Sequence, residues 1–183
     1  MPSSSASAVG FASLCPARSV RIHSCTATSD SPQSPSNESR YDAIVNGARG
    51  LVFDGGELRH CMSDADARRR WNWTFWRRVL RGLVREIGIR SPLHAALLRP
   101  ETTRRLGASD AGTPAISGRV GANELWVIAV HREPGTATVS LRGLPAWARS
   151  GRAYPGGPLV SARGGTLRDH FPGWGVRVYR FRR

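Results

Sequence analysis

A short apolar segment flanked by glycines and followed by an amphipathic helical pattern constrains this chain more than any other feature. The segment Gly47–Phe53 ends in three consecutive large apolar residues, as expected of a strand buried on both faces. A parallel strand of this kind needs neighbouring strands on both edges. The serine-rich segment before it has no strand pattern, and the segment after it has an antiparallel one. One strand and one helix cannot bury each other, so we expect this unit to be part of a larger architecture.

The helix after this strand is predicted to begin at Ser63 and to end at Gly88. Ser63 is a good N-cap residue, and Asp64 and Asp66 suit the positive end of the helix dipole. Apolar residues at intervals of three and four form one face, which predicts a single long helix with Trp73 and Trp76 in the core. The residues of this face are Trp73, Trp76, Leu80, Leu83, Val84 and Ile87. A second, shorter helix is predicted from Ser91-Pro92 to just before Pro100.

Beyond a polar connector the hydrophobic period changes from helical to two. Glu124–Val130 predicts a buried strand, and residues 137–141 alternate between apolar and polar side chains. Glu133-Pro134-Gly135 is expected to join these two strands as a hairpin turn. Turns at residues 155–157 and 164–165 bound weaker strands, and a last strand covers residues 175–179. Short strands at this spacing predict an antiparallel β-sandwich over residues 114–183.

Length and charge limit the possible functions. The chain has 183 residues, whereas a complete (β/α)8 barrel needs roughly 250. The formal net charge is +14, and all 27 basic residues are arginine. Because these arginines are scattered along the chain, GC-rich codon usage explains them better than a polyanion-binding surface, and nucleic-acid binding is the weaker alternative. No apolar stretch approaches the length of a membrane span, so we expect no membrane partner.

The first 40 residues differ in composition from the rest. They are rich in serine, alanine, proline and threonine, and they contain no acidic residue before Asp30. Such a composition cannot bury enough apolar surface to offset the entropy of ordering, so we expect a disordered leader. A targeting segment is the alternative, because transit peptides have a similar composition. The three cysteines, Cys15, Cys25 and Cys61, show no metal-ligand spacing, and no cofactor or metal is expected.

The order of these elements resembles the C-terminal part of bacterial (β/α)8 glycoside hydrolases of the β-galactosidase-like kind. The most similar segments are Tyr41–Gly50, Trp71–Trp76 and Gly175–Phe181, and the resemblance covers residues 41–183. It implies an α+β fold in three parts. These are a disordered N-terminus over residues 1–40, a remnant of a TIM-barrel β/α unit with a long helix over 41–106, and a small antiparallel β-sandwich over 114–183.

The resemblance also bears on the site residues. Glycoside hydrolysis requires two carboxylates held about 5 to 9 Å apart. In the resembling enzymes these acids stand at the ends of the fourth and seventh barrel strands, which precede the part that this chain resembles, so no catalytic residue is assigned. Asp54 and Glu57 follow the predicted strand in a glycine-containing loop and are expected to hydrogen-bond sugar hydroxyls. Phe53 stands where an aromatic side chain would stack on a sugar ring. A solvated loop is the alternative for both carboxylates.

Three functions follow from these observations. The first is a fragment related to glycoside hydrolases that is inactive alone, because both catalytic carboxylates are absent. The second is a non-catalytic carbohydrate-binding β-sandwich, which needs an exposed aromatic surface built from residues such as Trp71, Trp126, Trp147 and Trp174. The third is an arginine-rich nucleic-acid-binding protein. We also expect self-association, because the apolar helix face would have no barrel to cover.

Overall fold

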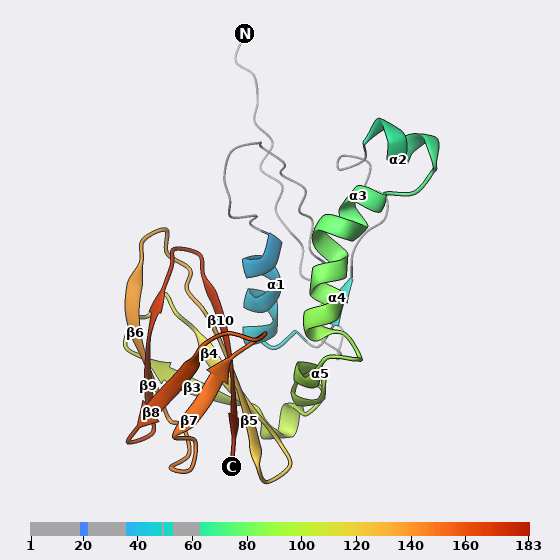
Figure 1. The fold of residues 1–183 in the computed structure, drawn as a ribbon. Helices are drawn as coiled ribbons and strands as arrows, with labels where there is room; N and C mark the ends of the chain where they lie inside the picture. Colours follow the sequence, from blue (N-terminus) through green and yellow to red (C-terminus); the bar gives the residue numbers. More distant parts are fainter. Residues whose placement is uncertain (1–18, 22–35, 49, 53–62) are drawn as a thin grey trace.

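The computed structural model describes residues 19–21, 36–48, 50–52 and 63–183, and a closed barrel of eight β-strands forms one side of the molecule (Figure 1). The barrel strands are β3 (Arg104–Ala108), β4 (Ala115–Val120), β5 (Glu124–Val130), β6 (Ala137–Arg142), β7 (Ser150–Ala153), β8 (Leu159–Arg163), β9 (Thr166–Phe171) and β10 (Val176–Arg182). Two further strands, β1 (Ser19–Arg21) and β2 (Gly50–Val52), pair in parallel as a separate sheet.

Helices gather beside the barrel, and Figure 1 shows α1, α4 and α5 along one side of it, with α2 beyond them. The α-helices are α1 (Ser36–Val45), α2 (Asp64–Arg68), α3 (Trp73–Phe75), α4 (Arg81–Ile87) and α5 (Pro92–Leu97). The π-helix η2 (Trp76–Leu80) joins α3 to α4, and the 3-10 helix η3 (Pro100–Thr102) leads into β3.

The predicted antiparallel sandwich is wrong. Strands β3 and β10 connect what would have been its two separate sheets, and the result is one closed barrel. The barrel order is β10-β5-β4-β3-β6-β9-β8-β7, and all pairs are antiparallel. Strand β3 pairs with β4 through Arg104–Leu106 and with β6 through Gly107 and Ala108. Strand β10 pairs with both β5 and β7. Closure of the barrel pairs the backbone N–H and C=O groups that the edge strands of a sandwich would leave without partners.

The predicted TIM-barrel β/α remnant is also wrong. Strand β2 does have a partner, since Leu51 aligns with Val20 of β1. The single long helix is interrupted as well. It is divided into α2, α3, η2 and α4, and Arg70, which lies between α2 and α3, has a left-handed backbone with φ of 54°. The predicted starts of the helices are confirmed, because the hydroxyls of Ser63 and Ser91 accept N–H groups of the first turns of α2 and α5.

Two of the predicted turns have different outcomes. The turn at Gly164-Gly165 is confirmed, because Arg163 pairs with Thr166 and both glycines have positive φ, as a two-residue hairpin requires. The hairpin predicted at Glu133-Pro134-Gly135 is wrong. Strand β5 pairs with β4 and β10, whereas β6 pairs with β3 and β9, so this segment crosses from one side of the barrel to another.

Alternation along the strands separates two apolar clusters. Side chains that point into the barrel form its interior, and Val139, Leu141, Phe171, Tyr179 and Phe181 are each fully buried there. Side chains on the outer face of β4, β5 and β10 pack against α1 and α5, including Ile116, Trp126 and Ile128. Strand β5 is therefore buried on both faces, which explains why its sequence is apolar without interruption.

Candidate ligand-binding sites

Two tryptophans at the start of α3 form an exposed aromatic pair: Trp71 lies just before the helix, and Trp73 is its first residue. The side chain of Trp71 is 57% exposed and that of Trp73 is 43% exposed. Their ring centroids are 6.2 Å apart with an interplanar angle of 65°, an edge-to-face arrangement. The prediction that Trp73 belongs to the core is wrong. The break in the helix turns this residue towards solvent, where an indole face is available to a ligand.

The side chain and the backbone of Asp66 together hold the segment that carries this pair. Its Oδ2 accepts the Thr74 N–H at 3.0 Å, while the Asp66 N–H donates to the Ser63 hydroxyl at 3.2 Å. The Trp71 N–H donates to the Asp66 carbonyl at 3.3 Å. The hydrogen bond with the Thr74 side chain contributes most to lowering the pKa of Asp66 to about 2, against the opposing effect of burial. The carboxylate is therefore ionised at neutral pH.

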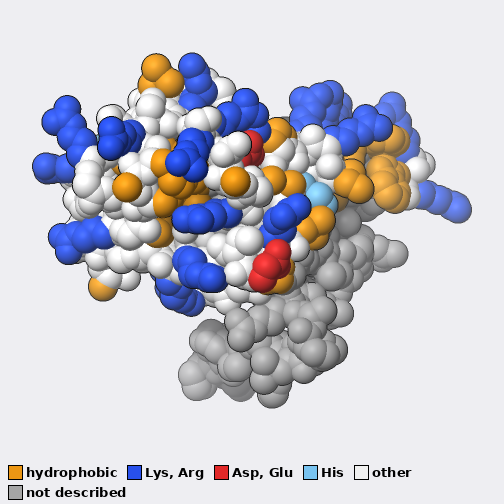
Figure 2. All heavy atoms as spheres, turned by 90° about the horizontal axis from the view of Figure 1, so that it is seen from below, with side chains coloured by type: hydrophobic (Ala, Val, Ile, Leu, Met, Phe, Trp, Pro, Cys, Tyr) orange, Lys and Arg blue, Asp and Glu red, His pale blue; other side chains and the backbone are white. Residues whose placement is uncertain are grey.

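A second site is an open groove on the barrel surface with a volume of about 280 Å³. The described residues that line it are Ser150, Gly151, Arg152, Leu159, Arg180 and Arg182. They come from β7, β8 and β10, where Arg152 stands directly opposite Arg180 on one side and Leu159 on the other. Arginine side chains also predominate over acidic ones on the face shown in Figure 2. The groove combines three guanidinium groups with one exposed apolar side chain, and Leu159 is 71% exposed.

Glu124 is the carboxylate that balances part of this charge. Its Oε2 lies 2.8 Å from Arg180 Nη2 and 3.4 Å from Arg182 Nε, and its Oε1 accepts the Trp126 indole N–H at 2.6 Å. Burial opposes ionisation of Glu124. The hydrogen bonds from Arg180 and Trp126 and the two positive charges outweigh that effect and lower its pKa. The Arg180 guanidinium also lies over the Trp126 ring at 5.0 Å, so it is held in place from two sides.

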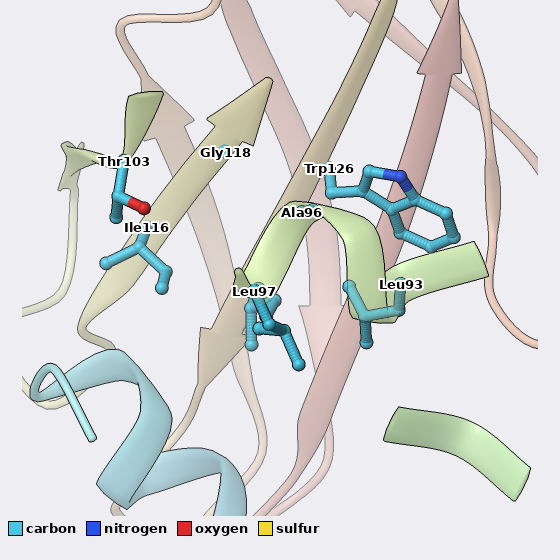
Figure 3. Close-up of a pocket in the computed structure, with 8 residues that line it drawn as sticks. Leu93, Ala96, Leu97, Thr103, Ile116, Gly118 and Trp126 are labelled. Carbon is cyan, nitrogen blue, oxygen red and sulfur yellow. The ribbon is translucent and has the colours of Figure 1, made fainter. Parts of the chain in front are cut away.

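A small apolar cavity beneath α5 is too small to hold a ligand. Figure 3 shows Leu93, Ala96 and Leu97 of α5 facing Ile116 and Trp126 of the barrel. The cavity has a volume of about 10 Å³, close to the minimum for one water molecule. Gly118 lies under this helix, and a Cβ atom there would stand 3.5 Å from the Ala96 carbonyl oxygen. The cavity is thus a packing feature of the helix against the sheet.

The residues Asp110, Thr113 and His131 have the side-chain types of a nucleophilic triad but not its geometry. Thr113 Oγ1 lies 2.6 Å from Asp110 Oδ2 and 2.8 Å from His131 Nδ1. Asp110 Oδ2 lies 3.3 Å from the same Nδ1, so acid and hydroxyl meet at one ring nitrogen. His131 Nε2 lies 2.9 Å from the Gly135 carbonyl oxygen. Both ring nitrogens are occupied, and Thr113 is fully buried. This cluster anchors the loops after β3 and β5, and it lowers the pKa of Asp110 chiefly through the Thr113 hydroxyl.

The predicted site residues differ in their outcomes. Phe53, Asp54 and Glu57 lie outside the described residues. The prediction that Trp126 belongs to an exposed sugar-stacking surface is wrong, because its side chain is buried under the helices. Trp174 is 46% exposed in the turn between β9 and β10. Sequence reasoning missed the arginine groove, although the alternation in Arg180-Phe181-Arg182 places both arginines on the outer face.

Within residues 19–21, 36–48, 50–52 and 63–183, no group of three or more histidine, cysteine or acidic side chains is arranged to hold a metal ion. No helix in these ranges has the length and apolar character needed to cross a membrane.

Comparison with known proteins shows a likeness of fold. No protein-family model matches the sequence, and no curated protein matches it. Among solved structures, an α-amylase from Geobacillus thermoleovorans, solved with acarbose, matches 80% of this chain with 21% identity and a TM-score of 0.52. An α-amylase from Anoxybacillus matches 72% of the chain with 20% identity and a TM-score of 0.47. The chain spans 34% and 29% of these two enzymes, respectively. The likeness to the Geobacillus enzyme shows that this chain shares part of that enzyme's fold.

Proposed function

We propose that this chain is a glycoside-hydrolase-related protein that binds carbohydrate without hydrolysing it. The observation that carries the proposal is the exposed pair Trp71 and Trp73, since large amphipathic rings left in solvent are the side chains on which sugar rings stack. The fold shared with an α-amylase crystallised with acarbose supports the choice of carbohydrate as the ligand. The hydrogen bonds of Asp66 reduce the entropy lost on binding, because they hold the backbone around the pair before the sugar arrives.

The described carboxylates support binding rather than hydrolysis. Hydrolysis needs two carboxylates facing each other across a sugar ring. Asp42 pairs with Arg132, Glu124 pairs with Arg180, and Asp169 accepts the Tyr179 hydroxyl. Asp66 accepts the backbone of α3, and Asp110 accepts the Thr113 hydroxyl. None of the described residues that line the arginine groove is acidic. We therefore propose that the chain is inactive alone.

Binding to acarbose and amylose tests the proposal. Trp71→Ala and Trp73→Ala are each expected to weaken binding by about tenfold or more, because each removes a stacking surface. Trp174→Ala is the matched control, since it removes another exposed tryptophan from the barrel side of the molecule. Affinity electrophoresis in amylose gels and calorimetry with acarbose would measure the change. Equal binding by all four proteins, or no binding by the unmodified chain, would contradict the proposal.

The predicted loop residues form a separate part of the proposal. We propose that Asp54 and Glu57 hydrogen-bond sugar hydroxyls and that Phe53 stacks beside them, as the resemblance to β-galactosidase-like enzymes implies. The purified chain should hydrolyse aryl glycosides no faster than buffer. Turnover that disappears in Asp54→Asn or Glu57→Gln would show that the chain is an enzyme. Weaker sugar binding by the same variants without any turnover would support the proposed role.

We also propose that residues 114–183 contain an independently folding unit, preceded by a helical part over residues 41–106 and a leader over residues 1–40. The antiparallel pairing among β4 to β10 supports this division. The boundary at 114 leaves out β3, which pairs with both β4 and β6 and closes the barrel. Hydrogen exchange can compare fragments 114–183 and 103–183. Slow exchange of the amides of Glu124–Val130 in the shorter fragment would support the boundary at 114. Fast exchange there and slow exchange in the longer fragment would move the boundary to β3.

Self-association is the remaining proposal. The helical side of the molecule exposes several large apolar side chains, namely Trp71, Trp73, Val84, Ile89 and Leu98. A second copy of the chain covering this surface would remove apolar area from water. Light scattering across a range of concentrations should therefore show a rising molar mass. A monomer at all concentrations, with no binding of a hydrophobic dye, would contradict self-association.

A further inference from the structure

The arginine groove carries more positive charge than its own protein neighbours balance. Arg152 stands directly opposite Arg180 across β7 and β10, and like charges at opposed positions repel. Glu124 lies against Arg180 and Arg182, on the β5 side of β10. Arg152 donates instead to the Gly157 carbonyl at 3.2 Å, and no described carboxylate lies within salt-bridge distance of it. A bound anion would relieve this repulsion.

The arrangement of the three guanidinium groups in the groove favours binding of a planar anion. Arg180 is held by Glu124 and by the Trp126 ring, so little side-chain freedom is lost when it accepts a further partner. Arg152 and Arg182 are exposed and reach the groove from different strands. Guanidinium groups bind carboxylates through two parallel N–H groups, which favours a carboxylate over a neutral hydroxyl. The exposed Leu159 offers an apolar surface beside these charges.

We infer that this groove binds the carboxylate groups of an acidic polysaccharide, and that Arg152, Arg180 and Arg182 are the residues that recognise them. The inference extends the proposed function, since it adds a second, charge-selective site to a carbohydrate-binding protein. A nucleic acid is the competing polyanion. It is less favoured because the described lining of the groove contains no aromatic side chain on which a base would stack.

Calorimetry with an oligogalacturonate of defined length, using the full chain, tests the inference. Arg152→Gln and Arg182→Gln should each weaken binding by about tenfold, the loss expected when one charge-assisted contact is removed. Binding should also weaken as salt is added. Arg142→Gln is the matched control. It makes the same change of charge on an exposed arginine of β6, which is separated from β10 by three strands in either direction around the barrel.

Each outcome is decisive. A tenfold loss in the two groove variants, with Arg142→Gln unchanged, supports the inference. An equal loss in all three variants would show general attraction to a positive protein and would overturn it. Equal affinity for a single-stranded DNA of the same charge, lost in Arg152→Gln, would assign the groove to nucleic acid. Acarbose binding that depends on Trp71 without any oligogalacturonate binding would overturn this inference and leave the proposed function standing. Oligogalacturonate binding without acarbose binding would support this inference and contradict the proposed function.

Discussion

The Asp66 carboxylate accepts the backbone N–H of Thr74 at 3.0 Å, across eight positions of the sequence. This bond connects α2 to α3 and encloses the segment that carries Trp71 and Trp73. It explains how two large aromatic side chains can stand in solvent on a fixed backbone. Asp66 is itself buried, at 2% exposure, so its contacts are shielded from competing water.

Replacing Asp66 should loosen this segment while leaving the barrel intact. In Asp66→Ala the Thr74 N–H loses its acceptor, and the first turn of α3 loses its cap. Amides of residues 64–74 should exchange faster with solvent, whereas those of β5 should not change. Asp64→Ala is the control, because Asp64 is an exposed acid in the same turn. Equal effects of the two variants would mean that the helix dipole, not the capping bond, orders the segment.

The same contact predicts how the segment responds to acid. The pKa of Asp66 in the folded protein is about 2, below its ordinary value of 3.8. The stabilising contribution is therefore complete above about pH 4 and is lost as the pH falls towards 2. Exchange of the Thr74 amide, corrected for the intrinsic pH dependence, should accelerate over this range. The acceleration should be absent in Asp66→Ala, and its persistence there would assign the effect to another group.

The absence of a side chain at Gly118 is predicted to allow α5 to pack closely against the barrel. A Cβ atom at this position would make an ordinary contact with the Ala96 carbonyl oxygen at 3.5 Å, so Gly118→Ala should be tolerated (Figure 3). Gly118→Val adds two methyl groups beyond that Cβ atom, next to a space of about 10 Å³. Overpacking should cost about 1–3 kcal/mol in the free energy of unfolding. Urea denaturation of both variants would measure the difference, and equal stability would show that α5 can shift outwards.

Adjacent residues of β6 test the alternation of the barrel wall. Val139 is fully buried inside the barrel, whereas Thr138 faces outwards and is exposed. Val139→Asp places an unpaired carboxylate in the interior, which should cost more than about 4 kcal/mol and unfold the barrel. Thr138→Asp should leave the free energy of unfolding nearly unchanged. Circular dichroism during thermal unfolding would distinguish them. A folded Val139→Asp variant would mean that water reaches the barrel interior.

The sequence by itself determined the features that depend on neighbouring residues. The apolar segment Glu124–Val130, the helix starts at Ser63 and Ser91 and the turn at Gly164-Gly165 were predicted from local pattern, and the structure confirms them. Each depends on backbone preferences or hydrogen bonds within a few positions, so its signal is present in a short window.

Tertiary structure decided how these elements are combined. An alternating strand fits a sandwich or a barrel equally well, and the pairing of β3 with both β4 and β6 closes the barrel through contacts between distant segments. The apolar spacing around Trp73 predicted burial, but the break after α2 turned that residue outwards. The arginine groove likewise required β7 to lie beside β10, which places Arg152 opposite Arg180. Strand pairing between residues far apart in sequence, which no local pattern encodes, assembled the groove and set the barrel topology.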